Sequence, residues 1–175
     1  MDKVIAAFDD FLHQKGLKFE GVVIGGAALL LIHVIDRATN DVDILSPEIP
    51  EEIKKASIEF AKKNPNLSLN PKEWFNNGPY SLKRDLTQGW RDRVQKVFKG
   101  KSLTLYTLGR MELLKAKLYA ACDRDIDFDD CIALRPTFEE LDSCLDWVLK
   151  GDANPLWPKR VKEVFAKLKK EVKNE

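Results

Sequence analysis

The sequence lacks the features that define membrane, metal-stapled and highly charged proteins. Its longest apolar run, residues 22–35, is shorter than the roughly 20 residues needed to span a bilayer, and it contains two glycines and a histidine. The three cysteines form no CxxC pair and are odd in number, which favours buried free thiols over a zinc site or a disulfide framework. The formal net charge is only +1, which argues against a protein that coats nucleic acid with its whole surface.

What is present suffices for a hydrophobic core. The chain has 175 residues, of which 44% are hydrophobic and 33% charged. This length and composition exclude a disordered chain and suit one domain that folds without a disulfide or a metal. Asp9 and Asp10 interrupt the segment in which a signal peptide would need an apolar core. We therefore expect a soluble, cytoplasmic protein without membrane contact.

Hydrophobic periodicity predicts both helices and strands in the first part of the chain. Apolar residues at helical spacing predict helices over residues 2–15, 27–35 and 50–63. Alternating or continuous apolar residues predict strands over residues 19–24 and 41–45, and a hairpin of strands 94–98 and 103–106. Residues 64–79 are rich in Asn and Pro and are expected to be irregular, with a short strand at 67–69.

The second part of the chain is predicted to be helical. A helix is expected from residue 109 onward, a capping box of Thr137 and Glu140 predicts another that ends near Lys150, and a last helix is expected over 159–173. This order of elements indicates an α+β fold, with a mixed β-sheet flanked by helices and a helical C-terminal portion. We expect one domain over residues 1–151, with residues 152–175 as a C-terminal helix packed on it.

Residues 25–44 carry the pattern most informative about chemistry. A predicted strand ends at Gly25 and Gly26, which let backbone N–H groups approach a phosphate where a helix begins. Asp41 and Asp43 are two residues apart on the next strand, so their carboxylates face one way. Two like charges repel unless a cation lies between them, and a hard divalent cation such as Mg²⁺ or Mn²⁺ suits oxygen ligands. The pattern therefore indicates phosphoryl or nucleotidyl transfer.

The same stretch resembles the DNA polymerase β-type nucleotidyltransferase superfamily, in which Gly-Gly and a helix precede Arg-x-Thr-x-Asp-x-Asp. The residues that carry this resemblance are Gly25, Gly26, Arg37, Thr39, Asp41 and Asp43. The chain also contains a second signature, Lys-Leu-x-Ala followed by Arg and Asp-x-x-Asp. This signature resembles one found in small bacterial proteins related to the AbiEii/AbiGii toxin branch of type IV toxin–antitoxin systems. It is carried here by Lys117, Arg124, Asp127 and Asp130.

The resemblance implies a role for each of these residues. The residues implied to be catalytic are Asp41, Asp43, Lys117, Asp127 and Asp130, of which Asp41 and Asp43 would bind the metal ion. The residues implied to bind the nucleotide are Gly25, Gly26, Arg37, Thr39, Arg93 and Arg124. The implied reaction moves a nucleoside monophosphate from an NTP onto a hydroxyl of RNA, such as tRNA, or of a protein or small molecule. A cognate antitoxin is the implied partner.

Other interpretations of these residues stay open. Asp41 and Asp43 also fit solvent-facing acids that discourage aggregation at an edge strand. Lys117 also fits a solvated helix residue, and Asp127 and Asp130 fit acids that favour a helix N-terminus. Arg91 and Arg93 beside Trp90 fit either a nucleotide-binding group or a half-buried Trp covered by arginine side chains.

One departure from the superfamily pattern supports a different function. A third carboxylate usually comes from a later central strand, but the candidate strand at residues 103–106 carries none. The alternative is therefore a catalytically degenerate protein of the same fold that acts as a nucleotide-binding or regulatory module.

Overall fold

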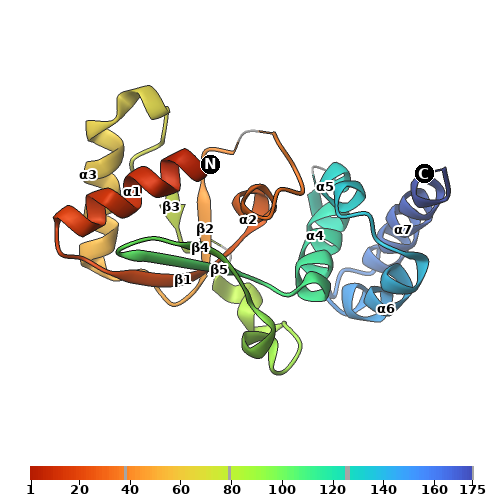
Figure 1. The fold of residues 1–175 in the computed structure, drawn as a ribbon. Helices are drawn as coiled ribbons and strands as arrows, with labels where there is room; N and C mark the ends of the chain where they lie inside the picture. The colour runs from red at the N-terminus through yellow and green to blue at the C-terminus, as the bar shows by residue number, and fades with distance from the viewer. Residues whose placement is uncertain (38, 79, 125–126, 175) are drawn as a thin grey trace. The chain divides into compact units, whose positions relative to one another are not determined.

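A computed structural model describes residues 1–37, 39–78, 80–124 and 127–174 (Figure 1). The chain divides into an N-terminal unit, Met1–Gly109, and a C-terminal unit, Arg110–Glu175, and each is described by itself. The described elements confirm the expected α+β class, because a mixed sheet precedes a helical C-terminal part. The predicted boundary after residue 151 stays a prediction. None of the described helices is both long and apolar enough to cross a membrane.

The N-terminal unit is built on a sheet of five described strands in the order β3-β2-β1-β5-β4. Strand β1 pairs in parallel with β5 and antiparallel with β2, while β3 joins β2 in parallel and β4 joins β5 antiparallel. The elements in chain order are α1 (Asp2–Gln14), β1 (Phe19–Ile24), α2 (Gly25–Leu31), β2 (Val42–Ser46), α3 (Glu51–Lys63), the 3-10 helix η1 (Pro65–Leu67), β3 (Phe75–Asn76), the 3-10 helices η2 (Tyr80–Arg84) and η3 (Trp90–Arg93), β4 (Gln95–Lys99) and β5 (Leu103–Thr107).

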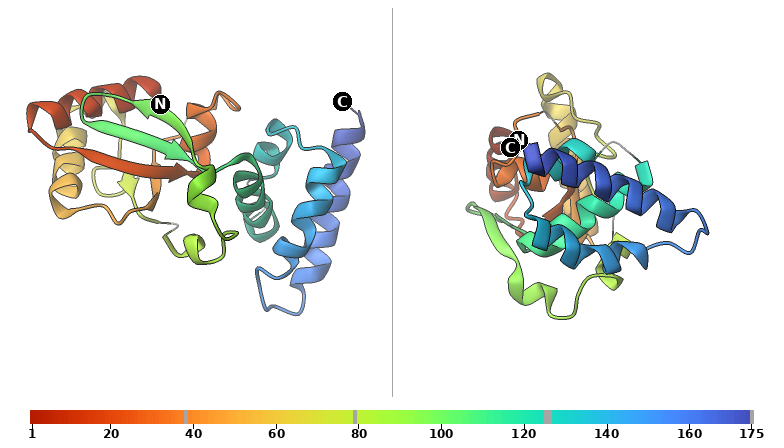
Figure 2. Two further views of the ribbon diagram at one scale, coloured as in Figure 1. Left: turned by 60° about the horizontal axis from the view of Figure 1, so that its bottom comes forward. Right: turned by 90° about the vertical axis from the view of Figure 1, so that its right-hand side faces the viewer.

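An aromatic cluster joins α1 and α3 to this sheet, and Figure 2 shows the two helices beside it in a second orientation. The ring of Phe8 lies 5.2 Å from that of Phe60 and 5.0 Å from that of Trp74, measured between centroids. The Trp74 indole N–H donates to the carbonyl of Ser57, at 3.0 Å. Packing of this kind buries large apolar areas and gives the cluster fixed geometry. It holds β3 beside β2.

The β4–β5 hairpin is anchored to α1 by one buried carboxylate. Asp9 accepts hydrogen bonds from the backbone N–H groups of Lys101, Ser102 and Leu103, at 2.9, 2.8 and 2.7 Å. Burial by itself raises the pKa of the Asp9 carboxyl, but the three N–H donors and Lys101 outweigh it and hold the pKa below its ordinary value. A side chain at Gly100 would overlap the Asp9 carboxylate, so the turn needs a glycine there.

The structure corrects several sequence-based boundaries. No strand forms at residues 67–69, because Leu67 belongs to η1 and Ser68 has a φ of 52°; the short strand is β3, at Phe75–Asn76. Helix α2 includes both glycines and ends at Leu31, earlier than expected, and His33 follows with a φ of 58°. Strand β2 begins at Val42, so Asp41 directly precedes it.

The C-terminal unit consists of α4 (Arg110–Arg124), α5 (Phe128–Ala133), α6 (Phe138–Leu149) and α7 (Trp157–Asn174). The capping box of Thr137 and Glu140 is confirmed, and α6 starts after it. Glu140 also accepts from the Arg110 guanidinium at 2.6 and 2.9 Å, which holds the pKa of the Glu140 carboxyl below its usual range. Helices α6 and α7 pack side by side (Figure 2).

The three cysteines, Cys122, Cys131 and Cys144, are all buried, as expected. Burial raises the pKa of the Cys144 thiol to about 11 and that of the Cys131 thiol further still. Both thiols are therefore protonated at neutral pH and unreactive as nucleophiles.

Candidate functional site

The turn from β1 into α2 brings the predicted glycine pair against β2. Gly25 has a φ of +73°, in the left-handed region that glycine adopts without a steric penalty. A Cβ at this position would lie 2.9 Å from Oδ2 of Asp43, so only a glycine lets that carboxylate approach the backbone. The register agrees, because Ile24 is the Cα partner of Asp43.

Asp43 also contacts the neighbouring strand β3. The Asn76 side-chain amide donates to Asp43 Oδ1 at 3.1 Å, and the two residues are Cα partners in the parallel β2–β3 pair. On the same side, a Cβ at Gly78 would lie 3.6 Å from Asp43 Oδ1. The carboxylate is therefore held between Gly25, Asn76 and Gly78.

The remaining residues of the first signature gather beside this carboxylate. The Thr39 hydroxyl donates to Asp41 Oδ1 at 2.6 Å. A Cβ at Gly26 would lie 3.4 Å from Thr39 Oγ1 and 3.8 Å from Nη2 of Arg37. The structure thus brings the glycine pair, Arg37, Thr39 and the two acids into one small region of the N-terminal unit.

Burial follows the alternation expected for Asp41 and Asp43. Asp41 is exposed and Asp43 is half-buried, whereas the intervening Val42 and the following Ile44 are completely buried. The two acids therefore share the side of the chain that faces away from the core.

Asp41 and Asp43 are the carboxylates of this region that could ligate a divalent cation. Among the described residues, no group of three His, Cys, Asp or Glu side chains is arranged to hold a metal. Mg²⁺ commonly takes only one or two carboxylates from a protein and completes its shell with water and substrate phosphates. Asp41 and Asp43 supply that number of carboxylates.

Arg93 lies at the same end of the sheet as Gly25 and Asp43. Gln95, where β4 begins, pairs with Thr107 at the end of β5, and Thr107 pairs with Val23 near the end of β1. Helix η3, which contains Arg93, immediately precedes β4. The Arg93 guanidinium donates to the Gln88 carbonyl at 3.3 Å, and Arg91 lies over the ring of the buried Trp90, 4.5 Å from its centroid.

The second signature forms a buried ion cluster within the C-terminal unit. The Lys117 ammonium donates to Asp127 Oδ1 at 2.8 Å and to Asp130 Oδ2 at 2.6 Å, and all three residues are buried. Arg124 adds a contact to Asp127 Oδ2 at 3.2 Å. The predicted contribution of Lys117 and the two acids to the Asp41–Asp43 site stays a prediction, since the groups lie in separate units.

Strand β5 carries no carboxylate, as its sequence indicated. Thr107, its residue beside Val23, is completely buried, and its hydroxyl donates to the Val23 carbonyl at 2.9 Å. The position next to the end of β1 is therefore occupied by a hydrogen-bonded threonine instead of an acid.

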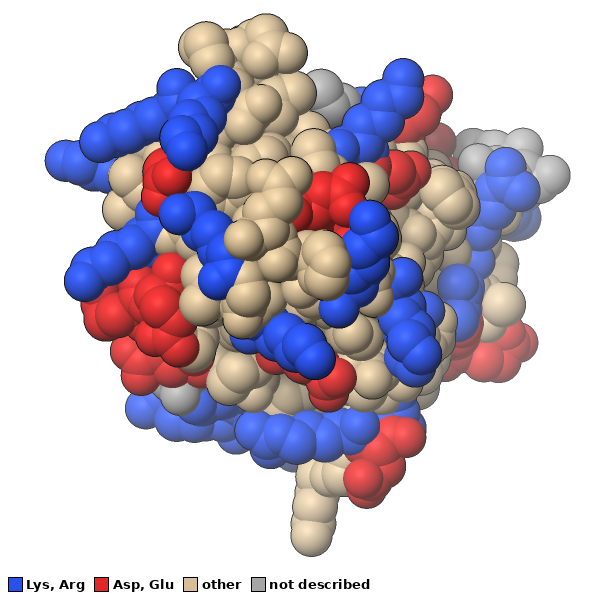
Figure 3. All heavy atoms as spheres, turned by 60° about the vertical axis from the view of Figure 1, so that its left-hand side comes forward, with Lys and Arg blue, Asp and Glu red and all other residues tan. Residues whose placement is uncertain are grey.

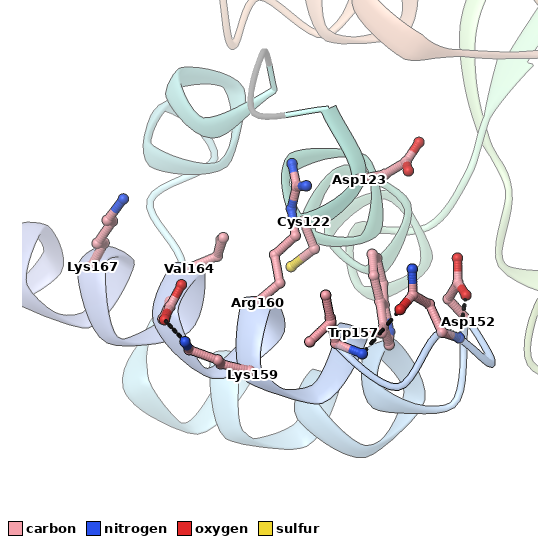
Figure 4. A pocket seen from close by; sticks show the side chains of 11 residues that line it. Cys122, Asp123, Asp152, Trp157, Lys159, Arg160, Val164 and Lys167 are labelled. Carbon is pink, nitrogen blue, oxygen red and sulfur yellow. Dashed lines mark hydrogen bonds and ion pairs between the residues drawn. The ribbon is translucent and has the colours of Figure 1, made fainter.

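A pocket of about 510 Å³ lies in the C-terminal unit, between the end of α4 and the start of α7 (Figure 4). Its lining mixes three basic side chains with acidic and apolar ones, and Lys159 contacts Glu163 at 4.0 Å. None of the predicted site residues lines it. Elsewhere, the face in Figure 3 shows Lys and Arg side chains interspersed with Asp and Glu, in keeping with the near-zero net charge.

Sequence reasoning missed Asn76 as a neighbour of Asp43. The residue lies in the segment predicted to be irregular, and β3 is only two residues long, so no hydrophobic alternation marks it. The available signal was the run Asn76-Asn77-Gly78, in which a glycine follows two amides.

The comparisons with known proteins agree with the first signature. The family described as a nucleotidyltransferase of unknown function (DUF6036) matches residues 2–135, which include all of the N-terminal unit except Met1, together with α4 and α5. No curated protein and no solved structure matches the chain. Because the match covers more than half of its length, the chain belongs to this nucleotidyltransferase family.

Proposed function

We propose that this protein is a magnesium-dependent nucleotidyltransferase that moves a nucleoside monophosphate from an NTP onto a hydroxyl acceptor. The observation that carries the proposal is the seating of the Asp43 carboxylate against Gly25, beside Asp41. Family membership supports the reaction class and an NTP substrate. The metal, the nucleotide and the acceptor are the further content of the proposal.

The two carboxylates would hold the cation, which when bound offsets negative charge on the triphosphate oxygens. The missing Cβ at Gly25 leaves room for the Asp43 carboxylate. The backbone N–H groups of Gly25 and Gly26 would contact the phosphate oxygens. Arg37 and Thr39 lie against Gly26, where a guanidinium and a hydroxyl suit the same phosphates.

The acceptor hydroxyl oxygen attacks the α-phosphorus in line with the leaving group. A new oxygen–phosphorus bond forms as the bond to the bridging oxygen of the β-phosphate breaks. Pyrophosphate leaves with that electron pair, and the hydroxyl proton passes to solvent. The chain's part in this reaction is to orient the triphosphate and to complement its charge.

The acceptor and partners follow from the resemblance rather than from the site. RNA, with tRNA as one example, a protein hydroxyl and a cognate antitoxin remain within the proposal. So do the nucleotide-directed roles of Lys117, Asp127, Asp130, Arg93 and Arg124.

Thermal denaturation tests the proposal directly. A ligand that binds the folded state raises the melting temperature, so Mg²⁺ together with the correct NTP should stabilise the wild type. The double variant Asp41→Asn/Asp43→Asn should lose this shift while keeping its melting temperature without ligand. A wild type that shows no shift with any NTP would overturn the proposal. Labelled NTP incubated with total RNA then separates transfer from binding alone.

A second candidate function is a degenerate member of the family that binds nucleotide without transferring it. Thr107 favours this alternative, because it stands near the end of β1 on the strand where a third carboxylate is expected. A melting-temperature shift with NTP but no transfer to RNA, protein or small hydroxyl acceptors would support it.

A further inference from the structure

The Asn76 side chain is fixed by three hydrogen bonds. Its amide nitrogen donates to Asp43 Oδ1 at 3.1 Å and to the Glu73 carbonyl at 2.7 Å. Its oxygen accepts from the backbone N–H of Gly78. Each polar atom of the amide is therefore used, and the side chain has one orientation in which it can make all three contacts.

This orientation serves Asp43. The strand register sets Asn76 directly beside Asp43, and the amide donates to the carboxylate oxygen opposite the one that faces Gly25. A carboxylate gripped on one oxygen by an N–H donor and limited on the other by a glycine backbone cannot rotate freely. Groups that hold a metal-binding carboxylate in this way change the affinity of the site for the metal ion, although they do not contact the ion themselves.

We propose that Asn76 is a positioning residue for the cation site, acting through its hydrogen bond to Asp43. The inference rests on the proposed function, because it takes Asp43 as a cation ligand. Asn76 lies on β3, the strand that pairs with β2 at the edge of the sheet, and it offers Asp43 a neutral amide.

The neighbouring Asn77 supplies a matched control. Its side chain accepts from the Ile49 N–H at 2.8 Å and donates to the carbonyls of Ile44, at 2.8 Å, and Pro47, at 3.0 Å. Asn77 thus fixes the backbone after β2 through the same chemistry as Asn76. None of these contacts involves a carboxylate.

Two substitutions at Asn76 predict opposite changes in cation affinity. Asn76→Ala removes the donor, so we expect Mn²⁺ or Mg²⁺ to bind about tenfold more weakly. Asn76→Asp replaces the donor with a second carboxylate beside Asp43, so the two charges repel in the absence of metal. This variant should melt at a lower temperature than the wild type without cation, yet bind the cation more tightly, since the cation relieves the repulsion.

The experiment is titration calorimetry with MnCl₂ and with MgCl₂, alongside melting curves with and without each cation. Wild type, Asn76→Ala, Asn76→Asp and Asn77→Ala are compared. The proposal expects weaker binding by Asn76→Ala, tighter binding by Asn76→Asp, and unchanged affinity but lower stability for Asn77→Ala.

Two kinds of outcome would overturn the inference, and only one of them also contradicts the proposed function. Equal loss of affinity in Asn76→Ala and Asn77→Ala, or unchanged affinity in both Asn76 variants, assigns Asn76 a purely structural role and leaves the proposed function intact. A wild type that binds neither cation, alone or with an NTP, removes the cation site and this inference together.

Discussion

Two pairs of aspartates in this chain occupy opposite surroundings. Asp127 and Asp130 are buried in the C-terminal unit, and both contact the ammonium of Lys117. Asp41 and Asp43 are exposed and half-buried in the N-terminal unit, where a hydroxyl and an amide donate to them. A buried charge needs a partner within the fold, and Lys117 supplies one for Asp127 and Asp130, whereas Asp41 and Asp43 lie nearer to solvent. We therefore expect a change in the first pair to alter mainly stability, and a change in the second pair to leave stability nearly intact so that its effect on ligand binding can be measured.

The largest predicted effect comes from breaking the buried cluster. Lys117→Met removes the ammonium that both buried carboxylates contact, and we expect it to lower the free energy of unfolding by about 4 kcal/mol. Chemical denaturation of the C-terminal unit within the full chain measures this loss.

The triple variant Lys117→Met/Asp127→Asn/Asp130→Asn is the control, because it removes all three charges and should recover much of the stability. The opposite result is also informative. If Lys117→Met keeps its stability but loses the melting-temperature shift with Mg²⁺ and NTP, Lys117 acts on the triphosphate as the resemblance implies.

Asp9 extends the comparison within the N-terminal unit, since it is a buried carboxylate satisfied by backbone N–H groups. Asp9→Ala removes the acceptor of three backbone N–H groups, two of which are buried, so we expect a loss of about 3 kcal/mol. The neighbouring Asp10→Ala removes only an exposed pair with Lys101 and should leave the free energy of unfolding nearly unchanged.

The same carboxylate gives a pH dependence with a definite sign. The folded-state pKa of Asp9 is lowered, so its contribution is fully present above its ordinary pKa of 3.8 and is lost as the pH falls through the folded value. Urea denaturation between pH 7 and pH 3 should therefore show a larger acid-dependent loss for the wild type than for Asp9→Ala. Parallel pH profiles would contradict this assignment.

Long amphipathic elements could be predicted from the sequence because their signal is local. Helix α1 and the β4–β5 hairpin appear close to where periodicity and the Lys-Gly-Lys turn indicated. The predicted position of the short strand is wrong because a strand of two residues, such as β3, cannot show hydrophobic alternation. The position of β3 depends instead on Trp74 and on pairing with β2. The location of the short strand at 75–76 instead of 67–69 is therefore set by tertiary contacts.

The residues of the candidate site likewise fall into those that the sequence could predict and those that it could not. Gly25, Asp41 and Asp43 could be found because their spacing along the chain carries the chemistry. Asn76 could not, because its contact with Asp43 joins residues on separate strands across 33 positions. Burial of Lys117 was equally hidden, since a lysine in a helix with weak amphipathic patterning gives no sign of whether it faces solvent.

Gly25 tests whether the acid pair depends on close backbone approach. Gly25→Ala forces an alanine into a left-handed conformation, which costs about 1–2 kcal/mol, and it also pushes a Cβ against Asp43 Oδ2. We expect the cation-dependent melting-temperature shift to disappear.

Gly16 provides the control for backbone strain alone. It has a φ of +65°, and a Cβ added there would meet nothing within 4 Å, so Gly16→Ala should lose similar stability. Its response to Mg²⁺ and NTP should equal that of the wild type. If both alanine variants respond normally, the approach of Asp43 to Gly25 has no role in binding.

Asp41→Asn should affect stability very little, in contrast to Lys117→Met in the buried cluster. Asp41 is exposed, so Asp41→Asn should change the free energy of unfolding by no more than about 0.5 kcal/mol. It should nevertheless abolish most of the stabilisation by Mg²⁺ and NTP, because half of the proposed carboxylate set is gone. Asp36→Asn, at another exposed acid of the same loop, should leave both quantities unchanged. An Asp41→Asn variant that responds to Mg²⁺ and NTP like Asp36→Asn would show that Asp41 is not needed for binding. The proposed cation site would then contain Asp43 without Asp41.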